Sequence, residues 1–145
     1  MHIIYYFENI NKDSSKDGLD FTKNVTDALN YIINQKKVDF NIIFFEKTNI
    51  RHSKIREKLN DADMKKFIET DKFFKFDNGV TMYRILKNDN LKEVQTVFFH
   101  LTTPQELEKI CNKNPNKIFI WAPYKLNELE KIKRNPNYKL IKLNS

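Results

Sequence analysis

The sequence predicts a single α/β domain: a three-layer sandwich with a mostly parallel sheet, helices on both faces, and an antiparallel hairpin inserted at about residues 72–86. Three observations predict it. The 145 residues are 40% hydrophobic, enough for one core. Short continuous apolar runs, typical of strands buried on both faces, alternate with amphipathic helical patterns. The connections are short and no linker interrupts them, so residues 1–145 are expected to form one domain.

The first half of the chain begins with a strand, a helix and a second strand. Residues 2–7 form an apolar run that leads into a turn-rich stretch, which predicts a buried strand. From Asp20, a candidate cap, apolar residues recur at steps of three and four, as in an amphipathic helix. Residues 40–45 again form a mainly apolar run that is too short for a helix. A buried strand is therefore expected there.

The middle of the chain predicts a broken helix followed by a hairpin. Ser53 is placed to cap a helix, and the apolar pattern restarts near Asp61. Residues 72–86 change to a period of two around Asn78-Gly79, a dipeptide suited to a two-residue type I′ turn. A further strand is expected at 94–101.

The last part of the chain returns to alternating helices and strands. Thr103, Pro104 and Glu106 combine a helix cap, a first-turn proline and a capping-box glutamate. Residues 118–121 predict a strand, a helix is expected from about Lys125, and 138–143 predict the final strand. This order of elements is what makes a largely parallel sheet the expected architecture.

The charge balance indicates an acidic or phosphate-rich partner. There are 26 Lys and Arg residues against 19 Asp and Glu, for a formal net charge of +7. Such a surface attracts nucleic acid or a phosphorylated ligand. A compositional bias toward lysine would give the same charge without a binding role, and this alternative stays open.

Several chemistries are excluded by what the sequence lacks. Two glycines cannot build a dinucleotide-binding fingerprint or a P-loop, so no nucleotide cofactor of that kind is expected, nor any other cofactor. Standard motifs of metalloproteases, serine hydrolases and kinases are missing. The single cysteine, Cys111, is expected to be a buried hydrophobe in a reducing compartment. No apolar window is long enough for a membrane span, so we expect a cytoplasmic protein without membrane contact.

The carboxyl ends of the predicted strands are the expected location of a site, because ligands of open α/β sheets gather there. Three residues at this edge, Glu8, Glu46 and His100, form the catalytic set if the protein is an enzyme, either around a divalent metal or as acid and base. The same edge supplies three ligand-binding candidates: Lys47, Thr103 and Tyr124. Solvated strand ends, a buried histidine and a helix cap would explain these residues equally well.

Two further groups are candidates for binding phosphate or bases. The densest basic stretch contains Arg51, His52 and Arg56 near a helix start. On the hairpin, Lys75, Tyr83 and Arg84 interleave an aromatic ring with cations, a pattern that suits stacking on a single strand. A solvated helix face and cross-strand packing are the respective alternatives.

Three functional classes follow from the sequence. The first is a basic binding module for nucleic acid or a phosphorylated ligand, which requires its cations to share one face. The second is a protein-interaction module, such as an inhibitor or immunity protein, which requires an exposed apolar patch and no pocket. The third is a small metal-assisted phosphodiesterase or nuclease, which requires the three catalytic candidates to converge. The oligomeric state is left open.

Overall fold

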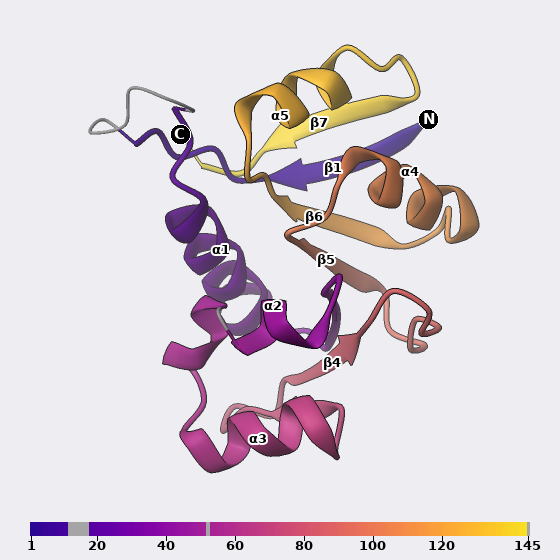
Figure 1. Cartoon of the computed structure of the whole chain (residues 1–145). Helices are drawn as coiled ribbons and strands as arrows, with labels where there is room; N and C mark the ends of the chain where they lie inside the picture. The colour runs from indigo at the N-terminus through magenta and orange to yellow at the C-terminus, as the bar shows by residue number, and fades with distance from the viewer. Residues whose placement is uncertain (12–17, 52, 145) are drawn as a thin grey trace.

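The computed structural model describes residues 1–11, 18–51 and 53–144, and these form one mixed sheet with helices around it (Figure 1). The strand order in the sheet is β3-β4-β2-β5-β6-β1-β7. All neighbouring pairs are parallel except β3 and β4, which are antiparallel. The predicted mostly parallel α/β sheet with an antiparallel hairpin at its edge is confirmed. The strands are β1 (His2–Tyr6), β2 (Phe40–Ile43), β3 (Phe73–Lys75), β4 (Thr81–Ile85), β5 (Thr96–His100), β6 (Ile118–Ala122) and β7 (Tyr138–Lys142).

Two of the longer helices, α1 and α4, begin at the capping residues expected from the sequence. The side chain of Asp20 accepts a hydrogen bond from the Lys23 backbone N–H at 3.1 Å, and that of Thr103 accepts one from Glu106 at 3.3 Å. None of the described helices is long and apolar enough to cross a membrane. They are α1 (Phe21–Asn30), continued by the π-helix η1 (Tyr31–Lys36), then α2 (Lys47–Arg51), the 3₁₀-helix η2 (Lys54–Glu57), α3 (Asp61–Glu69), α4 (Pro104–Lys113) and α5 (Leu126–Lys133).

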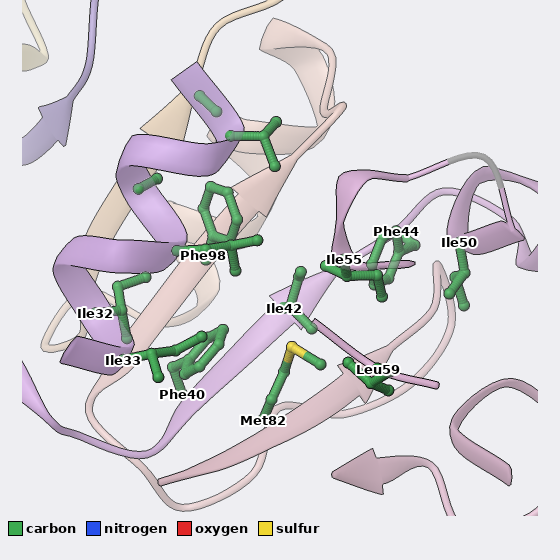
Figure 2. Close-up of a cluster of buried hydrophobic side chains, with 14 of the residues drawn as sticks. Ile32, Ile33, Phe40, Ile42, Phe44, Ile50, Ile55, Leu59, Met82 and Phe98 are labelled. Atoms are coloured by element: carbon green, nitrogen blue, oxygen red, sulfur yellow. The ribbon is translucent and has the colours of Figure 1, made fainter. Parts of the chain in front are cut away.

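Consecutive strand residues belong to two different buried clusters. Phe98 of β5 packs in a cluster with side chains of α1, η1, α2, η2 and α3, whereas its neighbours Val97 and Phe99 pack with α4 and α5. Figure 2 shows part of the first cluster, where Ile32 and Ile33 lie beside Phe40 of β2. Because adjacent strand residues point to opposite faces, a strand buried in both clusters is apolar along most of its length. This explains the apolar run at 40–45, in which the one polar residue, Asn41, is fully buried with its side-chain amide bonded to the Lys92 backbone.

The hairpin turn differs from the predicted type I′ turn. The backbone N–H of Gly79 donates to the Phe76 carbonyl at 2.9 Å, and that of Phe76 donates to the Val80 carbonyl at 2.8 Å. Asp77 and Asn78 are therefore the central residues of the turn, and Gly79 follows with a φ of 93°. This is a three-residue loop that ends in a left-handed glycine. The longer loop shifts the cross-strand register by one residue relative to a two-residue turn at Asn78-Gly79, so that Phe74 lies opposite Met82.

Candidate functional site

The connections that follow the neighbouring strands β2 and β5 run in opposite directions along the sheet. The chain leaves β2 through α2 toward β3 and β4, and it leaves β5 through α4 toward β6, on the other side of β5 in the sheet. At such a switch point the two connections separate beyond the carboxyl ends of the strands and leave a crevice. A cleft of ≈ 540 Å³ lies here, between the carboxyl ends of β2, β4 and β5, the loop after β4, and α4.

The cleft combines an apolar part with a polar wall. Its volume falls within the range of small-molecule sites. The apolar lining comes mainly from strand ends and includes Phe45, whose side chain is 43% exposed. The polar lining comes from the loop after β4 and from α4. Its charged members are Lys87, Asp89, Glu106, Lys109 and Lys113.

Hydrogen bonds hold several groups of the cleft wall. One carboxylate oxygen of Asp89 accepts from the backbone N–H of Leu86 at 2.9 Å, which closes the loop after β4. The side-chain amide of Asn114 donates to the Ile110 carbonyl at 2.9 Å at the end of α4. The ammonium of Lys87 lies 5.1 Å from the centre of the Phe45 ring, within range of a cation–π contact. Three lysines against two carboxylates leave the wall with an excess of positive charge.

Of the predicted site residues that the structure describes, none lines this cleft. From the sequence, β4 is expected only as half of a hairpin, so its end is not among the strand ends expected at the carboxyl edge. In the structure β4 is also the parallel neighbour of β2. Its end and the following loop therefore join the carboxyl edge. Ligands gather at the carboxyl ends of parallel strands, and applying this rule to β4 adds the loop after β4 to the site. A second signal in the sequence is the spacing of Lys109 and Lys113, which are four positions apart on α4.

His100 lies in a second, smaller cavity of ≈ 200 Å³. Its ring is 2% exposed, and its Nε2 lies 2.8 Å from the hydroxyl oxygen of Ser53. The same oxygen accepts from the Ile55 backbone N–H at 3.2 Å, so Ser53 bonds both the imidazole and the start of η2. Phe44 and Phe21 pack against the ring at centroid distances of 4.7 and 5.6 Å. Burial lowers the pKa of His100 to about 4, and the ring is neutral at pH 7.

Ser53, expected only as a helix cap, also bonds the imidazole of His100. A hydroxyl bonded to a neutral imidazole is the arrangement that activates a nucleophile. Here the second ring nitrogen, Nδ1, is buried without a hydrogen-bond partner among the described residues, so no orienting carboxylate completes the pair. The observed contacts tie the start of η2 to the end of β5. They give the pair a structural role in joining these segments.

The structure does not bring the three catalytic candidates together. The Glu8 carboxylate accepts from Lys133 Nζ and the Tyr6 hydroxyl, each at 3.4 Å, at the end of β1. Glu46 accepts from the Thr48 hydroxyl at 3.4 Å, and His100 is buried against Ser53. Strand β6 separates β1 from β5. Within the described ranges no group of three or more His, Cys, Asp or Glu side chains could hold a metal ion.

The basic stretch after β2 is partly neutralised within the chain. Arg51 donates to a Glu69 carboxylate oxygen at 2.8 Å, and Lys47 donates to the other oxygen at 3.5 Å. The hydrogen bond from Arg51 is the main cause of the lowered pKa of Glu69. Arg56 is exposed on η2. His52 lies outside the described residues.

The hairpin does not present its predicted binding residues on one surface. Lys75 is exposed, and the Tyr83 ring lies 6.4 Å from that of Phe73 in a cross-strand pair. Arg84 is 4% exposed, and its guanidinium donates to the carbonyl of Ile68 in α3. Because consecutive strand residues point to opposite faces, Arg84 cannot share a face with Tyr83. Arg84 is therefore a structural residue that ties α3 to β4, which corrects the expected surface role.

The two remaining candidates at the carboxyl edge have identifiable local roles. The Thr103 hydroxyl caps α4. Tyr124 follows β6 and is 46% exposed, with its ring packed edge-on against Phe21 at 5.1 Å. The Lys125 ammonium lies 5.9 Å from the same ring. Neither residue lines the larger cleft.

Comparison of the chain with protein-family models, with curated proteins and with solved structures gives no match. The geometry of the two cavities and the charge around them are therefore the features that indicate a function.

Proposed function

We propose that this protein is a binding module for a small phosphorylated ligand, and that the ligand occupies the cleft between β2, β4, β5 and α4. The observation that carries the proposal is the position of Lys87, Lys109 and Lys113 around a ≈ 540 Å³ cleft at the switch point of the sheet. Lysine ammonium groups bind phosphate through charge-assisted hydrogen bonds. The net charge of +7 favours the approach of such a ligand.

We infer that the two buried clusters, one containing Phe98 and the other containing Val97 and Phe99, lie on opposite faces of the sheet. The domain is then a three-layer sandwich. Support comes from β5, where Val97 and Phe99 join one cluster and Phe98 joins the other. In this arrangement α1, α2 and α3 cover one face, and α4 and α5 cover the other. The cleft then lies where the α4 layer meets the carboxyl edge of the sheet.

A small ligand suits the distribution of cations better than nucleic acid does. A nucleic-acid surface needs many cations along one exposed face. The Lys and Arg residues expected to bind nucleic acid are Lys47, Arg51, Arg56, Lys75 and Arg84. Of these, Arg84 is buried, and both Lys47 and Arg51 bind Glu69. Lys75 lies on β3, which is an edge strand of the sheet. The lysines of the cleft, by contrast, surround one concave volume.

The cleft also favours ligand binding over the other two candidate classes. A protein-interaction module that acts through a flat surface does not require a cleft of this size. A metal-assisted phosphodiesterase requires ligands that converge, and Glu8, Glu46 and His100 are held by different partners. The proposal therefore assigns binding, without a chemical step.

Isothermal titration calorimetry with ribose 5-phosphate tests the proposal. The double variant Lys109→Gln/Lys113→Gln removes two cations from the wall, and we expect the dissociation constant to rise at least about tenfold, because a hydrogen bond to a charged group contributes roughly 1.5–3 kcal/mol. Lys65→Gln/Lys66→Gln on α3 removes the same charge away from the cleft and should bind as the wild type does. Equal weakening by both double variants, or no binding by the wild type at millimolar ligand, would refute the proposal.

A further inference from the structure

The cleft has two chemically distinct parts, and this division narrows the class of ligand beyond a phosphate. On α4, Lys109 and Lys113 are four residues apart and therefore lie on one side of the helix. The strand ends and the loop after β4 supply an apolar lining instead. It includes Ile43, Phe45, Ile85, Leu86, Leu91 and Leu101. An anion with a substantial apolar body satisfies both parts, whereas inorganic phosphate satisfies only the first.

Phe45 gives the apolar part a surface for stacking. It directly follows Ile43 and Phe44 at the end of β2, and 43% of it is exposed, while Phe44 is fully buried. An exposed ring beside a cleft provides a platform for a planar heterocycle. The Lys87 ammonium lies over this ring, 5.1 Å from its centre, so a stacked heterocycle either displaces it or occupies the opposite face of the ring.

The loop after β4 adds groups that can read the edge of a heterocycle. Asn88, Asp89 and Asn90 line the cleft in succession. Their side-chain amides carry both donors and acceptors, and the carboxylate is an acceptor. Asp89 is held in place by its bond to the Leu86 N–H, so the loop has a defined conformation.

We propose that the ligand of the cleft is a nucleoside monophosphate, with its base on Phe45 and its phosphate at Lys109 and Lys113. This inference rests on the proposed function, because it names the substance that the cleft binds. A monophosphate fits better than a di- or triphosphate. The glycine-rich loops that cradle a phosphate chain in P-loop and dinucleotide sites have no counterpart here, because neither Gly18 nor Gly79, the two glycines of the sequence, lines the cleft.

The test compares ligands that share a phosphate and differ in the base. Calorimetry with the four ribonucleoside 5′-monophosphates and with ribose 5-phosphate measures the contribution of the base directly. We expect at least one monophosphate to bind about tenfold or more tightly than ribose 5-phosphate, the gain that stacking of one base on an aromatic ring provides. If all five bind equally, the inference is overturned and the proposed function stands. If none binds, both fail.

A pair of matched variants assigns the gain to Phe45. Phe45→Leu keeps an apolar side chain and removes the ring, so the dissociation constant of ribose 5-phosphate divided by that of the tightest monophosphate should fall toward one. Phe73→Leu is the control, because Phe73 is 48% exposed on β3 and does not line the cleft. It should keep the wild-type ratio. A ratio that survives Phe45→Leu overturns the proposed stacking contact.

Discussion

The buried imidazole of His100 makes a quantitative prediction for folding stability. Its pKa of about 4 in the folded protein, caused by burial, compares with an ordinary value of 6.5. Above pH 6.5 the ring is neutral in both states and contributes no pH dependence. As the pH falls from 6.5 toward 4, the unfolded chain binds a proton that the folded protein excludes, so the folded state is destabilised by about 1.4 kcal/mol per pH unit. Between pH 7 and pH 5 this amounts to about 2 kcal/mol.

The variant His100→Gln isolates this contribution. Gln does not titrate and retains polar atoms that can bond to the Ser53 hydroxyl. The free energy of unfolding, measured from urea titrations at pH 7 and pH 5 by circular dichroism, should fall by about 2 kcal/mol more in the wild type than in the variant. Changes due to carboxylates and the other histidines occur in both proteins and cancel in the difference. Equal losses of stability in the two proteins would refute the reasoning, whatever the absolute stability of the variant.

Three further substitutions test the packing, the hairpin turn and a helix cap. Phe98→Ala, at a fully buried site, should lower the free energy of unfolding by about 3–5 kcal/mol in urea titrations, and a loss below 1 kcal/mol would contradict its central place in the core. Gly79→Ala should cost about 1 kcal/mol in thermal unfolding, because φ is 93° and an added Cβ meets nothing within 4 Å; no cost would contradict the left-handed turn. Thr103→Ala should cost about 1 kcal/mol while Thr103→Ser keeps the cap, and equal stability of these two variants would count against the capping bond to Glu106.

The fold was predictable where local signals and packing agree. The run at 40–45 is apolar everywhere except at Asn41 because β2 is buried in both clusters, and this pattern is visible without knowledge of strand order. The capping sequence at Thr103 starts α4 at the predicted residue, since the cap is a contact between neighbours in the chain. The short helix α2 was not predicted. Its five residues bury only Ile50, which gives no periodic pattern.

The site was less predictable because it depends on contacts between distant segments. The parallel pairing of β4 with β2 brings the loop containing Asp89 to the same edge as α4, and no local pattern encodes that pairing. The burial of Arg84 likewise depends on α3, where the Ile68 carbonyl accepts its hydrogen bond. His100 was found as a residue of the carboxyl edge, but its partner Ser53 lies 47 positions away in sequence. Such pairs become visible only in the folded structure.

The most direct test of the central claim is to locate the bound ligand by nuclear magnetic resonance. Backbone amide shifts of the ¹⁵N-labelled protein, recorded during a titration with ribose 5-phosphate, should change around Phe45, in the loop 87–91 and along α4 near Lys109 and Lys113. Shifts confined to α2 and α3, where Arg51 and Glu69 lie, would contradict the assignment of the cleft as the binding site. The absence of any shift at millimolar ligand would contradict the function itself.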